Sequence, residues 1–253
     1  MTSLDLDMPI INTHSHHLPE WERPVTLQEH LARSYTGWRD VSFDTPEARA
    51  EAFFKLRAHS PFVWLSRGLQ MAWNMPKPLS CDTWEVYEKT ALKLHEDDTF
   101  EHNLLLQCGY KRILLDAYSN PGYDNTNALF APVFRVNSFL YGYNSVVKDH
   151  NGNNPFHMYS LEIETLEDYV ETMARIVRQK KQSGCVALKA ALPYDRGLDL
   201  DVATIEQARA VFGKRDATPE EEKIFGDYIF AAQIFRRIPA SFFPRLFIVG
   251  LFP

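Results

Sequence analysis

The chain has 253 residues, of which 45% are hydrophobic and 24% are charged, and its formal net charge is -6. This composition is typical of a globular protein that forms one large domain or two modest ones. The acidic balance and the lack of basic blocks argue against nucleic-acid binding. No run approaches the roughly 18 apolar residues that a membrane-spanning helix needs, so we expect no membrane insertion.

The cysteines indicate a reducing compartment. Cys81, Cys108 and Cys185 are odd in number and far apart in the sequence. This pattern argues against a disulfide scaffold and against a cysteine-type zinc site. The N-terminus carries Asp5 and Asp7 before a short apolar run, which is not the pattern of a signal peptide. We therefore expect a cytoplasmic protein.

The first predicted element is a buried strand that ends in histidines. Residues 9–17 read PIINTHSHH, a short apolar run rich in β-branched residues followed by His14 and His16. Alternate residues of a strand share a face, so these two imidazoles point the same way. Because neutral imidazole is a common ligand of zinc, we expect His14 and His16 to bind a metal ion. The alternative is a solvated histidine-rich loop, and His17 is not expected to be a ligand.

The next region, 20–107, predicts a series of amphipathic helices. Their starts are marked by Thr26 with Glu29 in a capping box, by Thr45-Pro46, by Pro61, by Asp82 or Thr83, and by Phe100. We expect this region to be an insertion after the first strand. It either shapes a substrate pocket or forms an extra helical layer.

Apolar runs then predict strands at 112–116, 129–137 and 185–192. Near-continuous apolar runs are typical of parallel strands that are covered on both faces. A helix that begins after Thr165 and stops at Gly184 separates the last two strands. This alternation predicts parallel βα units. Two further helices are expected, near 202–212 and from Thr218 to about residue 237.

The end of the chain departs from this alternation. Residues 238–253 read IPASFFPRLFIVGLFP, in which 245–252 could form a strand with no helix after it. An exposed apolar strand favours association. A homo-oligomer is therefore an alternative to a monomer.

Three polar residues stand where chemistry is expected. Lys189 lies inside an apolar strand, where burying an amine costs free energy unless the amine is paired or faces a polar site. Lys189 is therefore either a metal-site residue or a lysine whose ammonium group reaches solvent. Arg135 ends another strand and could bind a substrate carboxylate bidentately or pair with a nearby acid. Asp195 follows the 185–192 strand, next to Arg196. We take Arg135 and Asp195 as candidate catalytic residues.

These features together resemble the amidohydrolase superfamily. The resemblance rests on the His14–His16 pair, the helical insertion, Phe134-Arg135-Val136, and the 186–189 segment followed by Tyr194-Asp195-Arg196-Gly197. It covers roughly residues 8–237 and is nearest to the metal-dependent hydrolases of the amidohydrolase-related branch, and the inserted helices also resemble those of uronate isomerases. It implies a TIM-barrel-like (β/α)8 fold with one or two divalent ions, zinc or alternatively manganese. His14 and His16 would be ligands, and Lys189 matches the carbamylated lysine that bridges two metals in some branches.

The chain also departs from that family. The histidines of strands five and six have no counterpart, since His157 is the last histidine, and the strand-eight aspartate is not accounted for. The residues after the fourth strand are about half of those that four more βα units would need. We therefore predict one incomplete domain over 1–253, with a helical insertion at 20–107 and an atypical tail at 238–253. A truncated product is the corresponding hypothesis.

The resemblance implies hydrolysis of a C–N or C–O bond in a small, carboxylate-bearing substrate. A metal-activated water would attack, while Arg135 would hold the carboxylate. One alternative is a uronate-isomerase-like or decarboxylase reaction on a carboxylic acid. Another is a catalytically inactive half-barrel, because the ligands of strands five, six and eight are missing.

Overall fold

The computed structural model describes residues 9–15, 23–37, 39–116, 129–230 and 246–248. The chain divides into two compact units. One comprises Met1–His17 and Tyr110–Pro253, and the other is Leu18–Gly109. No helix in the described part of the chain is both long and apolar enough to cross a bilayer.

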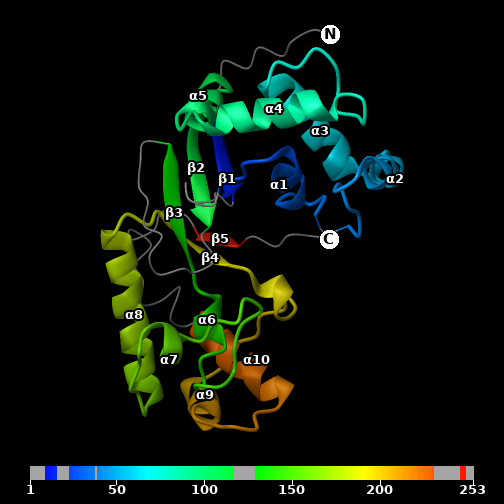
Figure 1. The fold of residues 1–253 in the computed structure, drawn as a ribbon. Coiled ribbons are helices and arrows are strands. Elements are labelled where there is room, and N and C mark those ends of the chain that lie inside the picture. Colours follow the sequence, from blue (N-terminus) through cyan, green and yellow to red (C-terminus); the bar gives the residue numbers. More distant parts are fainter. Residues whose placement is uncertain (1–8, 16–22, 38, 117–128, 231–245, 249–253) are drawn as a thin grey trace. The chain divides into compact units, whose positions relative to one another are not determined.

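The first unit carries a parallel sheet whose strands follow one another in chain order (Figure 1). The strands are β1 (Ile10–Ser15), β2 (Tyr110–Asp116), β3 (Phe130–Arg135), β4 (Ala187–Ala190) and β5 (Leu246–Ile248). Sequential parallel strands with intervening helices are the arrangement of a TIM barrel. The predicted fold class, a partial barrel of this type, is confirmed. Of the predicted tail, the described residues form β5.

The register of the sheet brings the ends of three strands together. Asp116 of β2 is the register partner of Val133 of β3. Two residues further along β3, Arg135 is the partner of Lys189 of β4. Because the strands are parallel, their carboxyl ends lie at one edge, which is the edge that carries active sites in α/β barrels.

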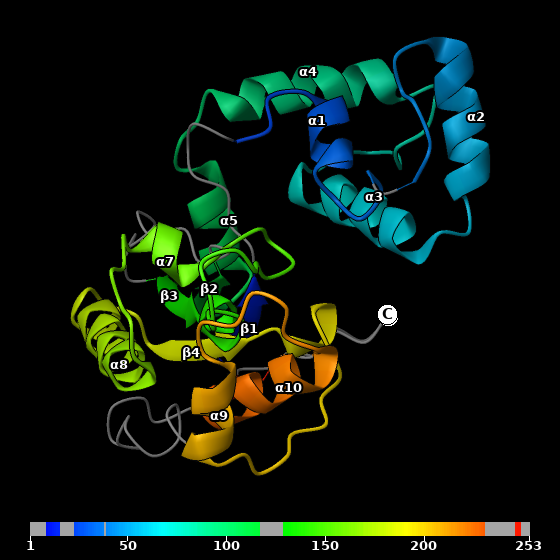
Figure 2. The same ribbon diagram turned by 90° about the horizontal axis from the view of Figure 1, so that it is seen from below.

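The described helices of this unit lie, in chain order, between β3 and β4 and between β4 and β5. They are α6 (Asn137–Leu140), α7 (Pro155–Met158), α8 (Leu166–Gln182), α9 (Ile205–Val211) and α10 (Pro219–Asp227), with a 3-10 turn η2 at Leu192–Tyr194. Contacts join α9 to α10, which lie side by side (Figure 2). The short elements α6, α7 and η2 were not predicted. The strand expected over 129–137 ends at Arg135, because α6 begins at Asn137.

Local chemistry explains where α8 begins and ends. The Thr165 side chain accepts a hydrogen bond from the backbone N–H of Asp168, as expected of an N-cap. Gly184 follows the helix with a φ of 105°, a conformation that strains residues with a side chain. The buried face of α8 packs into the main core of the unit with Phe134 of β3 and Leu188 of β4. Tyr169 is fully buried there, and its hydroxyl donates to the carbonyl of Phe139 at 2.8 Å.

The second unit consists of helices with a hydrophobic core of their own. They are α1 (Leu27–Ala32), α2 (Pro46–Leu56), α3 (Ser60–Ala72), α4 (Trp84–His95) and α5 (Phe100–Gln107). The capping box of Thr26 and Glu29 forms as predicted. Thr83 precedes α4 but makes no side-chain cap, and its Oγ1 instead accepts a hydrogen bond from the backbone N–H of Ser80 at 2.8 Å.

Substitution at Met173 tests the buried face of α8. Met173 is 1% exposed, so Met173→Ala should leave a cavity and lower the free energy of unfolding by about 2–5 kcal/mol. Arg175→Ala, at an exposed position of the same helix, should change it by less than about 0.5 kcal/mol. Urea denaturation followed by circular dichroism measures both. Equal losses in the two variants would contradict the assigned face.

Candidate active site at the carboxyl edge of the sheet

A buried cluster of three charges joins the ends of β2, β3 and β4. Asp116, Arg135 and Lys189 are exposed by only 2%, 2% and 5%. The ammonium of Lys189 lies 2.6 Å from Oδ2 of Asp116, and Nη2 of Arg135 donates to the same oxygen. One carboxylate is therefore shared by two cations.

The pKa values follow from this sharing. Burial raises the pKa of Asp116, but the hydrogen bonds and charges of Arg135 and Lys189 outweigh it, so that the pKa lies below the usual 3.8. Burial lowers the pKa of Lys189, and the positive charge of Arg135 adds to that effect, so the attraction of Asp116 offsets it only in part. Asp116 is thus held ionised, whereas the charge on Lys189 is less well compensated.

The cluster continues to His150, in the loop between α6 and α7. Nη1 of Arg135 lies 3.2 Å from Nε2 of His150. Because a guanidinium can only donate, Nε2 accepts this bond and the neutral imidazole carries its proton on Nδ1. Nδ1 in turn donates to Oδ2 of Asp195 at 2.8 Å. The hydrogen-bond network therefore assigns the tautomer of His150.

His150 and Asp195 form a dyad suited to general acid–base catalysis. The Asp195 side chain is 6% exposed, whereas that of His150 is 20% exposed and can meet a substrate. A buried carboxylate that accepts the Nδ1 proton orients the imidazole and stabilises its charged form. The ring of Tyr194 stacks on His150 with centroids 4.8 Å apart and limits its rotation further.

The two predicted catalytic residues, Arg135 and Asp195, meet in this network through His150. Both terminal nitrogens of Arg135 bind within the protein, one to Asp116 and one to His150. The arrangement therefore shows the ion pair that was the alternative reading of Arg135. Its role as a clamp for a substrate carboxylate stays a prediction.

The predicted metal ligands are only partly described. His14 lies near the end of β1, where its backbone N–H donates to the Asn12 side chain at 2.9 Å, and His16 lies outside the described residues. The amine of Lys189 is engaged by Asp116. Within the described ranges, no group of three or more His, Cys, Asp or Glu side chains could hold a metal ion. The metal site at His14, His16 and Lys189 thus remains a prediction.

Three residues of the network escaped the sequence analysis. Asp116 ends its strand just as Arg135 does, so the same strand-end argument could have found it. His150 carries no such signal, since it lies in a loop rich in Asn and Gly that reads only as a turn region. Asn137 lies at the end of an apolar run, but nothing in the run indicates that its side chain reaches Asp195, which it does at 2.9 Å.

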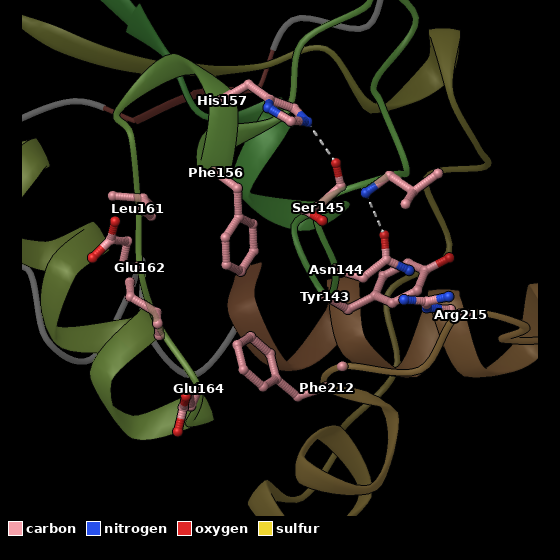
Figure 3. Close-up of a pocket in the computed structure, with 13 residues that line it drawn as sticks. Tyr143, Asn144, Ser145, Phe156, His157, Leu161, Glu162, Glu164, Phe212 and Arg215 are labelled. Atoms are coloured by element: carbon pink, nitrogen blue, oxygen red, sulfur yellow. Dashed lines mark hydrogen bonds between the residues drawn. The ribbon is translucent and has the colours of Figure 1, made fainter.

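A separate pocket of about 810 Å³ lies away from these residues (Figure 3). It is lined by residues 143–146, 156–157, 161–164, 212–213 and 215. The rings of Phe156 and Phe212, 6.5 Å apart, lie between the 161–164 segment and the loop that begins at Tyr143. None of the predicted site residues belongs to its lining. The pocket therefore adds no support to the predicted chemistry.

Comparison with known proteins places this geometry in a familiar fold. No protein-family model and no curated protein matches the chain. Among solved structures, glucuronate isomerase from Caulobacter crescentus matches with a TM-score of 0.66 and 16% identity, over 87% of this chain and 53% of that one. Uronate isomerase from Thermotoga maritima matches with a TM-score of 0.62 and 16% identity, over 88% and 56%. The fold is similar to that of uronate isomerases.

These matches support the predicted partial barrel at the level of the fold. The chain spans a little over half of the length of each of these isomerases. At 16% identity the match concerns the fold alone.

Removal of the shared carboxylate tests the buried charge cluster. Asp116→Asn removes the charged carboxylate that the buried Arg135 and Lys189 share, and we expect the free energy of unfolding to fall by about 3–5 kcal/mol. Glu164→Gln, which removes a carboxylate at an exposed position, is the control and should be nearly neutral. Urea denaturation at pH 7 measures both variants. A nearly neutral Asp116→Asn would contradict the shared ion pair.

The lowered pKa of Asp116 also predicts a pH dependence. A carboxyl group whose pKa is lower in the folded than in the unfolded chain stabilises the fold above the unfolded pKa, near 3.9, and this contribution is lost as the pH falls through the folded pKa. The urea midpoint should therefore fall more steeply below about pH 4 in the parent chain than in Asp116→Asn. Parallel pH profiles in the two proteins would contradict the assignment.

Proposed function

We propose that the chain carries the acid–base site of a sugar-acid isomerase, in which His150, oriented by Asp195, moves a proton between adjacent substrate carbons. The observation that carries the proposal is the His150–Asp195 dyad at the carboxyl ends of β3 and β4. Its setting, a barrel fold similar to that of two uronate isomerases, supports the same reading.

The geometry suits this proton transfer. Interconversion of an aldose and a ketose removes the proton from the carbon that bears the hydroxyl, while the carbonyl oxygen gains a proton, which gives an enediol. The hydroxyl on the first carbon then loses its proton to become the new carbonyl, and the neighbouring carbon gains a proton. Neither water nor an oxidant is consumed, so one accessible base can serve both steps. Nε2 of His150 carries the lone pair that accepts from Nη1 of Arg135, and it would take the substrate proton once that hydrogen bond is released.

The proposed substrate class, a sugar acid, is suggested by the two isomerases of similar fold. Beside the dyad, Arg135 and Lys189 share the carboxylate of Asp116. Arg135, whose guanidinium contacts both Asp116 and His150, is assigned to positioning the imidazole rather than to direct contact with the substrate. This assignment differs from the carboxylate clamp expected from the sequence.

We further propose a divalent ion, zinc or manganese, at His14 and His16, with Lys189 as a candidate third ligand. When bound, such an ion would polarise a substrate oxygen next to the carbon that loses its proton. Lys189 could take part only after leaving Asp116.

Metal-dependent hydrolysis of a small carboxylate-bearing substrate is the second candidate function. The His14–His16 pair at the end of the first strand favours it, because a metal there could activate a water molecule. The products separate the two reactions. Isomerisation conserves the mass of the substrate, whereas hydrolysis adds one water and breaks a bond.

Histidine substitutions test the proton-transfer role. The full chain is incubated with glucuronate or galacturonate in D₂O, and the product and its deuterium content are followed by NMR. His150→Gln should lower the isomerisation rate by about 10²–10⁴-fold, because the base is lost. His157→Gln is the matched control, since His157 lines the separate pocket, where Nε2 bonds the carbonyl of Ser145 at 2.7 Å.

The outcomes of this experiment are distinct. A selective loss in His150→Gln supports the proposal. Failure of the parent chain to isomerise either uronate, or an equal loss in both variants, contradicts it. Release of a cleaved product from amide or ester substrates would favour the hydrolase instead.

Metal content tests the proposed ligands. The purified chain should hold a divalent ion in near-stoichiometric amount, and His14→Ala/His16→Ala should lose it because two of the ligands are removed. His17→Ala should retain the ion, because His17 is expected to point to the opposite face of the strand. Elemental analysis after dialysis measures all three proteins. Full retention of the metal in the double variant would rule out this ligand pair.

A further inference from the structure

Asn137 links three parts of the candidate site. It is fully buried and is the first residue of α6, immediately after β3. Its Oδ1 accepts a hydrogen bond from the backbone N–H of Ala191 at 2.6 Å. Its Nδ2 donates to Oδ2 of Asp195 at 2.9 Å. The side chain therefore ties the end of β3 to the segment that follows β4.

The chemistry of these partners allows only one orientation of the amide. A backbone N–H can only donate, so the amide oxygen must face Ala191. An ionised carboxylate can only accept, so the amide nitrogen must face Asp195. An aspartate of the same shape could satisfy Ala191 but would turn a second carboxylate toward Asp195.

The position of Asp195 bears on which ring nitrogen of His150 carries the proton. Oδ1 of Asp195 accepts the backbone N–H of His150 at 2.6 Å, and Oδ2 accepts both Nδ1 of His150 and Nδ2 of Asn137. The Asn137 bond is the one that approaches Asp195 from outside the His150 loop. Without it, the hydrogen bonds that Asp195 accepts from the described residues would all come from His150, the residue that it is meant to orient.

We propose that Asn137 is a positioning residue, which holds Asp195 against Nδ1 of His150 and so leaves Nε2 of His150 as the basic nitrogen. The catalytic consequence rests on the proposed function. The positioning itself concerns the hydrogen-bond network and holds whether or not the chain is an isomerase.

Three charged side chains lie around His150 in the described part of the chain. Asp195 faces its Nδ1, and Arg135 faces its Nε2. Asp149 precedes His150 in the loop. Burial raises the pKa of Asp149, and the nearby negative charge of Asp195 raises it further. A second carboxylate placed at residue 137 would therefore add to an environment that already contains two acids and one cation.

The experiment is an NMR titration of the full chain that follows the imidazole nitrogens. Long-range ¹H–¹⁵N spectra distinguish the Nδ1–H from the Nε2–H tautomer, and His150 is identified by the signal that His150→Gln lacks. The parent chain should show the Nδ1–H tautomer. Asn137→Asp should raise the pKa of His150 by about one unit or more, because a second carboxylate favours the imidazolium. Asn103→Asp, which adds the same charge at an exposed position in the other unit, should leave it unchanged.

Asn137→Ser is the second variant, in case the aspartate prevents folding. Serine is too short to reach both partners, so the hydrogen bond between Asp195 and Nδ1 of His150 should weaken and the ¹⁵N signals of His150 should shift from those of the parent chain. An Nε2–H tautomer in the parent chain would overturn the proposal. So would folded Asn137 variants whose His150 signals and pKa match those of the parent chain.

The NMR signals and the pKa of His150 can be measured without catalytic turnover of a substrate. If they come out as expected while no uronate is isomerised, the positioning role stands and the proposed function fails. If isomerisation occurs, Asn137→Asp should lower kcat and shift its pH profile upward, with little change in KM. A purely structural role would not move the pH profile.

Discussion

The candidate site depends on one carboxylate shared by two cations. Asp116 is held ionised by Arg135 and Lys189, and each of the three residues comes from a different strand. Burial of charges is costly, and the cost is offset only while all partners stay in contact. The cluster therefore constrains the register of β2, β3 and β4 and fixes the direction of the Arg135 side chain.

That direction connects a buried structural cluster to an accessible chemical group. One terminal nitrogen of Arg135 binds Asp116, and the other donates to Nε2 of His150. The other ring nitrogen of His150, Nδ1, donates to Asp195. Cations and carboxylates thus alternate from the sheet interior to its carboxyl edge. Such an arrangement can hold a neutral imidazole in one tautomer, as a general base requires.

Local chemistry explains why much of the fold could be predicted. Buried parallel strands read as apolar runs, and threonine caps such as Thr26 and Thr165 mark helix starts because they satisfy nearby N–H groups. The missed elements are single turns. In α6, for example, the helix starts directly after β3 at Asn137, whose side chain is held by Ala191 and Asp195 rather than by its neighbours in sequence.

The sequence by itself determined the parallel strands, their order of appearance and the polar residues Arg135 and Lys189 near the ends of two of them, because periodicity and strand-end position depend on neighbouring residues. It did not determine the partners of those residues. Lys189 and Arg135 meet at Asp116 only because of the strand register, and His150 reaches Asp195 only because its loop returns to the sheet edge. Such contacts join residues far apart in the chain, so only the tertiary structure could show that Arg135 pairs with Asp116.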